Sequence, residues 1–271
     1  MDNTTIDSAP ASALPPRTGW RDLVWPKEHG SWSLALEPLA LGLLVAPSWP
    51  GVWLGLAVVA AFFARRPLKF AVLDSRPERR VAARGPLAVC IIGAAGCFGA
   101  ELATGGTVWL PWLLPSATAG VIFLRFDLRN AGREEAAEIA GASAFAFMPA
   151  AFAALAGWPA SAALSLAVVM SGRAVPTVML VRASLRAAKT GVRRFAPAIV
   201  GAGIACAAGV VFARAGLAPR TAVGLLALLA VRAVALWWWS EHHVLRARTL
   251  GLAESALGVV FVVAAALAWR A

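Results

Sequence analysis

The chain has 271 residues, of which 60% are hydrophobic and only 14% are charged, and its formal net charge is +11. Soluble domains carry about 25% charged residues, so this composition excludes an ordinary soluble protein and indicates one that lies in a lipid bilayer. The positive charge follows the connections between apolar segments, and we therefore attribute it to membrane orientation and expect no nucleic-acid partner.

The first nineteen residues are rich in Ala, Ser, Thr and Pro and contain no apolar core. This composition is typical of a disordered cytosolic tail and differs from that of a signal peptide. Residues 20–271 are expected to form a single transmembrane helical domain, because no stretch of soluble-domain composition interrupts them.

Nine apolar segments follow the tail, separated by short polar or turn-forming connections. In chain order they are residues 32–46, 51–64, 86–100, 108–124, 136–155, 160–180, 195–213, 221–239 and 250–269. Several are shorter than the roughly 20 residues that a spanning helix needs, so flanking residues are expected to extend them. The pattern predicts an all-α polytopic membrane protein with about nine transmembrane helices.

Basic residues divide unevenly between the two sides of such a topology. Twenty-one of the 25 Lys and Arg residues lie in the N-terminal part, follow the second, fourth, sixth and eighth segments or, in the case of Arg173, lie in the second half of the sixth. Loops that stay in the cytoplasm carry an excess of Lys and Arg. The distribution therefore places the N-terminus and the basic connections in the cytoplasm.

Two groups of polar residues lie at the predicted cytosolic ends of the first two segments. His29 precedes the first segment, and Glu37, next to Pro38, lies about two turns inside it. A buried carboxylate needs a cation, so Glu37 either pairs with an Arg of a neighbouring helix or belongs to a functional site. The run "FFARRPLKF" contains a basic group that is either a topogenic signal or an anion site, since Arg grips oxyanions through parallel hydrogen bonds.

Three further candidates lie later in the chain. Glu138 is one turn deeper than the acidic residues that begin the fifth segment, and Arg173 is surrounded by apolar residues. Arg232 lies within the eighth segment and must pair inward, with Glu37, Glu138 or Glu254 as possible partners. The complete set of expected ligand-binding residues is His29, Glu37, Arg65, Arg66, Lys69, Glu138, Arg173, Arg182 and Arg232.

No metal site or cofactor is expected. Cys90, Cys97 and Cys206 lie in apolar sequence without CxxC spacing, which is typical of small core residues. Glu241, His242 and His243 are consecutive, and consecutive side chains of a helix point to different faces.

Four motifs carry a resemblance to a known family. The runs "WPKEHGSWSLALEPLALGLL", "FFARRPL", "RNAGREEAAEIAG" and "LRARTLGLAESALGVVF" resemble the YwiC-like family of bacterial membrane proteins, from about Trp25 to the C-terminus. The resemblance implies a multi-pass protein of the bacterial cytoplasmic (inner) membrane and implies no particular activity.

The topology is also similar, more loosely, to that of the UbiA-type prenyltransferase superfamily. That resemblance implies a helical bundle with a lipid-accessible cavity, and in the superfamily Asp-rich motifs after helices two and six hold Mg²⁺ and an isoprenoid diphosphate. In this chain the connection after the second segment contains seven basic residues and a single Asp, Asp74. The connection after the sixth segment contains no carboxylate. A Mg²⁺–diphosphate site needs several carboxylate oxygens, so metal-dependent prenyl transfer is not expected.

Three functions follow from these observations, and the sequence does not decide whether the protein is an enzyme. The first is binding of an amphiphilic anion, an isoprenoid or lipid phosphate, in a cytosol-facing basic cavity. The second is transport of a small anion, and the third is non-catalytic assembly of another membrane complex. Membrane lipids are expected partners in each case.

Overall fold

The computed structural model describes residues 19–25, 29–243 and 246–270, and within these ranges the regular structure is entirely α-helical. Most of the expected N-terminal tail, residues 1–18, lies outside the described residues. The helices in chain order are α1 (Trp20–Val24), α2 (His29–Val45), α3 (Trp49–Leu73), α4 (Pro77–Gly105), α5 (Leu110–Asp127), α6 (Glu135–Ala146), α7 (Met148–Leu155), α8 (Ala160–Thr190), α9 (Ala196–Arg214), α10 (Arg220–His242) and α11 (Ala247–Arg270). The prediction of an all-α membrane protein is confirmed.

Each expected apolar segment lies on a helix, and the fifth is divided between α6 and α7. Six helical stretches in the described part are long and apolar enough to cross a membrane: Pro77–Gly105, Glu135–Leu155, Ala160–Thr190, Ala196–Arg214, Arg220–His242 and Ala247–Arg270. Trp32–Val45 is a shorter apolar helix, and α3 and α5 fall outside the six. The count of nine spanning helices stays a prediction.

Local sequence explains where several helices begin and end. The Ser48 hydroxyl accepts a hydrogen bond from the Gly51 backbone N–H at 3.1 Å, which caps the start of α3. Pro149 stands at the start of α7, where its missing N–H costs little, and the chain turns at Phe147 between α6 and α7. Gly191 ends α8 with φ 73°, a conformation that glycine adopts readily.

Two helices extend into the basic sequence that flanks their apolar segments, in line with the expectation that flanking residues lengthen the helices. Helix α3 continues to Leu73 and α8 to Thr190, so the basic residues after the second and sixth apolar segments are largely helical and not in loops. The connections themselves shrink to residues 74–76 and 191–195. Long Arg and Lys side chains allow a helix to extend beyond the apolar layer while its charges reach water.

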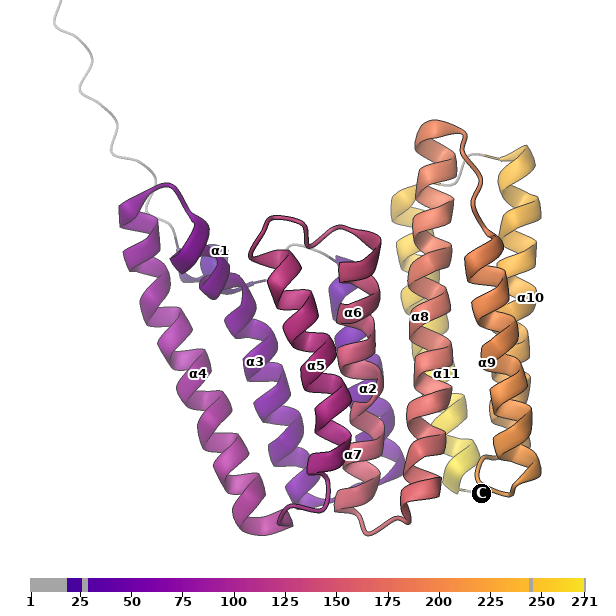
Figure 1. Cartoon of the computed structure of the whole chain (residues 1–271), viewed down its shortest axis with the longest axis horizontal. Coiled ribbons are helices and arrows are strands. Elements are labelled where there is room, and N and C mark those ends of the chain that lie inside the picture. Colours follow the sequence, from indigo (N-terminus) through magenta and orange to yellow (C-terminus); the bar gives the residue numbers. More distant parts are fainter. Residues whose placement is uncertain (1–18, 26–28, 244–245, 271) are drawn as a thin grey trace, which may run out of the picture.

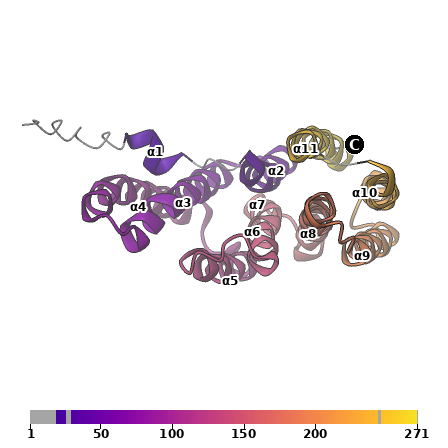
Figure 2. The same ribbon diagram turned by 90° about the horizontal axis from the view of Figure 1, so that it is seen from above.

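The helices form two layers (Figure 2). One layer contains α4, α3, α2 and α11, and the other contains α5, the α6–α7 pair, α8 and α9, with α10 closing one side. Helix α2 lies between the layer's two ends and packs against α11, so the first long helix meets the last (Figures 1 and 2). The main core is formed where these two helices meet α6, α7, α8 and α10, around Leu41, Leu166, Met170, Leu226 and Phe261.

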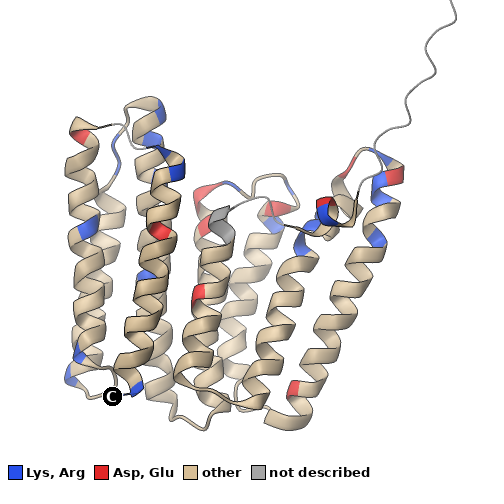
Figure 3. Ribbon diagram, turned by 180° about the vertical axis from the view of Figure 1, so that it is seen from behind, with Lys and Arg blue, Asp and Glu red and all other residues tan. Residues whose placement is uncertain are grey.

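Lys and Arg gather at one end of the bundle, the end that holds connections 74–76 and 191–195 (Figure 3). We call this the basic end, and the end that holds turns 46–48, 106–109 and 156–159 the opposite end. Two further Arg residues lie near the middle of their helices, Arg173 on α8 and Arg232 on α10. Charged side chains at this depth need partners that neutralise them.

Candidate functional site

A basic cluster of three cations and one carboxylate lies at the basic end of α3 and α5; it consists of Arg65, Arg66, Lys69 and Asp127. Arg65 and Lys69 are four residues apart on α3 and therefore share a face. Arg65 Nε lies 2.8 Å from Asp127 Oδ2, and Lys69 Nζ lies 2.9 Å from Asp127 Oδ1. Asp127, the last residue of α5, is 2% exposed.

These contacts determine the charge of Asp127. Burial alone would raise the pKa of Asp127, but the hydrogen bonds from Arg65 and Lys69 outweigh burial and lower it. Asp127 is therefore ionised, and both of its oxygens are occupied by cationic side chains.

An aromatic cluster adjoins the basic cluster. Its members are Trp25, Trp32, Phe62, Phe63 and Phe145. Their ring centroids lie 5.0 to 6.0 Å from one another along the chain of contacts, a spacing typical of interacting aromatic side chains. The pair Phe62 and Phe63 is separated from Arg65 of α3 by one residue, Ala64, and Arg66 donates a hydrogen bond to the Trp25 carbonyl.

An interior network of two carboxylates and two arginines joins four helices; its members are Glu37 on α2, Arg173 on α8, Glu254 on α11 and Arg232 on α10. Arg173 is 2% exposed. Its Nε lies 3.4 Å from Glu37 Oε2, and its Nη1 lies 3.7 Å from Glu254 Oε2. Arg232 Nη1 lies 2.8 Å from the same Glu254 oxygen, so charges alternate along the network.

Neutral groups complete the interior network. The Thr177 hydroxyl accepts from Arg173 Nη1 at 2.6 Å, and the Glu254 carbonyl accepts from Arg173 Nη2 at 3.1 Å. Ser33 donates to Glu37. Gly258 of α11 faces the Glu37 carboxylate so closely that a Cβ at this position would overlap it. The network therefore depends on α2 and α11 lying close together.

A third group of ion pairs joins α6 to α8. Arg182 Nη1 lies 2.7 Å from Glu138 Oε2, and Glu135 pairs with Arg186 at 3.3 Å. These side chains are 23 to 40% exposed, which is typical of surface pairs that contribute little to stability.

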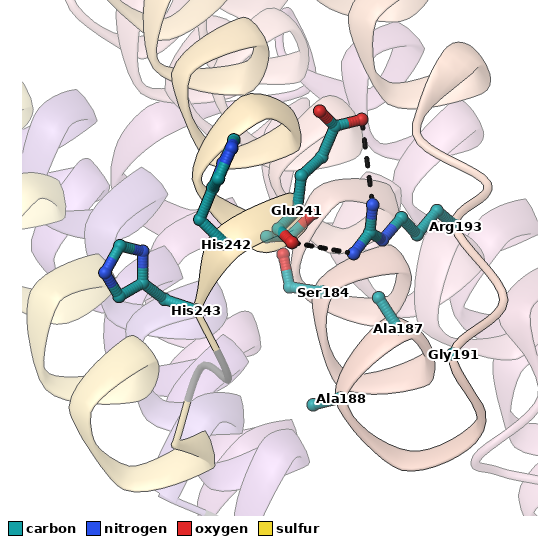
Figure 4. Close-up of a pocket in the computed structure, with 9 residues that line it drawn as sticks. Ser184, Ala187, Ala188, Gly191, Arg193, Glu241, His242 and His243 are labelled. Atoms are coloured by element: carbon teal, nitrogen blue, oxygen red, sulfur yellow. Dashed lines mark hydrogen bonds and ion pairs between the residues drawn. The ribbon is translucent and has the colours of Figure 1, made fainter.

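A pocket lies at the basic end between α8 and α10 (Figure 4). Arg193 bridges it, with Nη1 3.7 Å from Glu241 Oε1 and Nη2 donating to the Glu241 carbonyl at 3.2 Å. His242 and His243 point away from Arg193, as Figure 4 shows, and each ring lies against a Trp of α10. No group of three or more His, Cys, Asp or Glu side chains suited to a metal occurs among the described residues.

The expected site residues thus fall into separate groups. Arg65, Arg66 and Lys69 belong to the basic cluster, and Glu138 pairs with Arg182. Glu37, Arg173 and Arg232 belong to the interior network. The side chain of His29 lies outside the described part of the chain. The expectation that Arg232 pairs with an intramembrane carboxylate is confirmed, and the partner is Glu254.

Sequence reasoning missed one buried carboxyl group and the role of another. The pairing of Asp127 with Arg65 and Lys69 of α3 was not predicted. Glu101, fully buried on α4, was not considered at all. A signal was present, because Glu101 stands alone in the apolar run "CFGAELATGG" and an ionisable residue within a membrane helix is a functional candidate by default.

The family of this region can now be stated. Residues 25–152 match the model of the YwiC-like protein family. The resemblance seen in the sequence motifs is confirmed over these residues. No curated protein matches the chain, and no solved structure does. The YwiC-like region includes the basic cluster, the aromatic cluster, Glu37 and Glu101, whereas Arg173, Arg232 and Glu254 follow it.

Proposed function

We propose that the protein binds an amphiphilic anion, an isoprenoid or lipid phosphate, at the basic end of α3 in the bacterial cytoplasmic membrane, with this end and the N-terminus in the cytoplasm. The observation that carries the proposal is the contact of the aromatic cluster with the basic cluster, through Phe62, Phe63 and Arg66. An anionic head group and an apolar chain need these two environments side by side.

The charge of the basic cluster supports an anion. Arg65, Arg66 and Lys69 place three cationic side chains at the basic end of α3, and Arg65 and Lys69 both contact Asp127. Arg66 and Arg79 approach the same ring, that of Phe70, at 5.4 and 4.3 Å from its centroid. Cations gathered in this way attract a phosphate, and Arg offers paired N–H donors to its oxygens.

The aromatic cluster supports an apolar chain. Ring faces and edges pack favourably against unsaturated hydrocarbon, and the cluster is built from α2, α3 and α6, with Trp25 following α1. Because the described residues offer no carboxylate group suited to a metal, we propose that the phosphate is held directly by Arg and Lys.

The experiment is retention of a radiolabelled prenyl phosphate on the purified, detergent-solubilised protein, with Mg²⁺ and separately with EDTA. We expect equal retention in both conditions and a loss of at least tenfold in affinity for Arg66→Ala. Arg194→Ala is the matched control, since it removes one exposed positive charge at the same end of the bundle, away from the aromatic cluster. Competition with a phosphatidic acid distinguishes an isoprenoid phosphate from a general lipid phosphate.

Two results would overturn the proposal. Binding that requires Mg²⁺ would indicate a metal-dependent head-group site. Absence of binding in both conditions, with the protein still folded, would remove the anion site at α3.

The interior network favours a second candidate, transport of a small anion. Charged side chains deep in a membrane bundle often line ion pathways, and Arg173 and Arg232 are the cations that an anion would meet between α8, α10 and α11. Uptake of labelled inorganic phosphate or acetate into proteoliposomes tests it. Uptake that persists in Arg173→Gln at the parent rate would reject this candidate.

A further inference from the structure

Glu101 is a carboxyl group that neither proposed function uses. It lies one turn before the end of α4, at the opposite end of the bundle from the basic cluster, and it is 0% exposed. Neither of its side-chain oxygens has a hydrogen-bond partner among the described residues. This differs from the carboxylates of the interior network, each of which faces an Arg.

Uncharged groups enclose Glu101. A Cβ added to Gly105 would lie 2.7 Å from each of three atoms: Glu101 Oε1, Leu155 Cδ2 and Pro50 Cβ. The missing side chain of Gly105 therefore provides the space in which the carboxyl group meets α3 and α7. Trp109 is fully buried beside Glu101, but its indole N–H donates to the Gly106 carbonyl at 3.0 Å, so its interaction with the carboxyl group is weak and offsets only part of the cost of burial.

The protonation state follows from this environment. An ionised carboxylate without a cation or a hydrogen-bond donor loses its hydration and gains nothing in return, at a cost of several kcal/mol. A neutral carboxyl group loses far less. Glu101 is therefore neutral when α4 is packed as observed.

We propose that Glu101 is a proton-binding site whose occupancy controls the packing of α4 against α3 and α7 at the opposite end of the bundle. While the proton is bound, the carboxyl group fits between Pro50 and Leu155. When the proton leaves, the charge must reach water, and the end of α4 separates from both helices. Only 6% of the apolar span of α4 is buried, so most of this helix faces away from the rest of the bundle.

A neutral carboxyl group in a membrane has a specific reactivity that tests its state. Its proton moves to one nitrogen of a hydrophobic carbodiimide, and the resulting carboxylate oxygen adds to the central carbon to give an O-acylisourea. Rearrangement to the N-acylurea fixes the label, and no further reactant is required. Dicyclohexylcarbodiimide dissolves in the bilayer, which α4 faces over most of its apolar span, and reaches the protonated Glu101 during brief thermal fluctuations of the end of α4.

The experiment treats the full-length protein in proteoliposomes with dicyclohexylcarbodiimide, and peptide mass spectrometry then locates the label. We expect modification at Glu101 in acidic and neutral buffer, at least tenfold less in alkaline buffer, and none in Glu101→Gln. Glu37 and Glu254, which face arginines, serve as internal controls and should stay unmodified. Modification of these two residues with none at Glu101 would overturn the proposal.

A second measurement does not depend on reagent access. Thermal unfolding of the parent should shift to lower temperature in alkaline buffer, because the folded state then has to hold or expel an unpaired charge. Glu101→Gln keeps the shape of the neutral group and cannot ionise, so its unfolding temperature should change less over the same range. An identical alkaline shift in parent and variant would also overturn the proposal. Both results are independent of anion binding at the basic end.

Discussion

Arg232 Nη1 lies 2.8 Å from Glu254 Oε2, although the two residues are 22 positions apart and belong to different helices. The same Glu254 oxygen is 3.7 Å from Arg173 Nη1, and Arg173 in turn faces Glu37. The pair of α10 and α11 is thereby connected through α8 to α2. The charges that are most costly in a bilayer thus neutralise one another and fix which helices are neighbours.

We predict that Arg173→Leu strongly destabilises the protein. The substitution leaves Glu37 without its cation and weakens the neutralisation of Glu254, and breaking a buried pair from one side costs about 3–5 kcal/mol. Arg232→Leu should cost less, because its side chain is 17% exposed against 2% for Arg173 and contacts one carboxylate. Thermal unfolding in detergent measures both.

Arg214→Leu is the matched control for these two variants. Arg214 ends α9 and is exposed, so the change removes a positive charge without opening the interior network. Its unfolding temperature should stay close to that of the parent. An Arg173→Leu variant as stable as Arg214→Leu would show that the interior network contributes nothing to folding.

Two glycines of α11 provide a second prediction. A Cβ at Gly258 would overlap the Glu37 carboxylate, whereas a Cβ at Gly251 would meet nothing within 4 Å. Replacing a helical glycine with alanine otherwise stabilises a helix by about 1 kcal/mol. Gly251→Ala should therefore be neutral or stabilising, and Gly258→Ala should be destabilising because it displaces Glu37 from Arg173. If both substitutions changed the unfolding temperature in the same direction relative to the parent, the close approach of α2 and α11 would be contradicted.

The helices themselves could be predicted from the sequence, because apolar runs and Pro, Ser and Gly boundaries are local properties. An extension into flanking residues was expected, but its length in α3 and α8 could not be predicted, since the apolar pattern ends before Arg65 and before Arg182 while the helical hydrogen bonding continues. Arg, Lys, Ala and Leu have high helix propensity, which favours continuation of both helices, and α3 continues even across Pro67.

The partners within the site were harder to predict. Three carboxylates were possible partners for Arg232, and the choice depended on α10 lying next to α11, which residue spacing does not reveal. Asp127 and Arg65 are 62 positions apart, and their pairing requires α3 and α5 to meet at the same depth. Glu101 carries no local pattern except its isolation in an apolar run.

The basic cluster leads to a pH-dependent prediction. Because the pKa of Asp127 is lowered in the folded state, the ionised carboxylate contributes stability above the ordinary aspartate pKa of about 3.9. This contribution is lost as the pH falls through the lower, folded-state value. Asp127→Asn should therefore be less stable than the parent at neutral pH, by about 2 kcal/mol for the charge-assisted hydrogen bonds. The two proteins should converge in strongly acidic buffer.

Glu78→Gln is the control for Asp127→Asn. Glu78 is an exposed carboxylate in the first turn of α4, and its substitution removes the same charge at the same end of the bundle. Denaturant unfolding of the three proteins across the pH range gives the comparison. A stability difference for Asp127→Asn that does not narrow in acid would indicate a packing effect and not the ion pairs with Arg65 and Lys69.

The orientation of the bundle gives the last prediction. Ser48 precedes α3 at the opposite end of the bundle, and Ser75 follows α3 at the basic end. Ser161 lies near the start of α8, beside the turn at residues 156–159 of the opposite end. Each is replaced singly by Cys in a variant whose three native cysteines are changed to Ala. Since basic segments stay in the cytoplasm, a membrane-impermeant maleimide should label Ser48→Cys and Ser161→Cys in intact cells and Ser75→Cys only after permeabilisation.

Labelling of Ser75→Cys in intact cells would invert the orientation and place the basic cluster on the outer side. Labelling of Ser48→Cys and Ser75→Cys from the same side would mean that α3 does not span the membrane, which is the weakest point of the nine-helix topology because α3 is not among the six long apolar stretches.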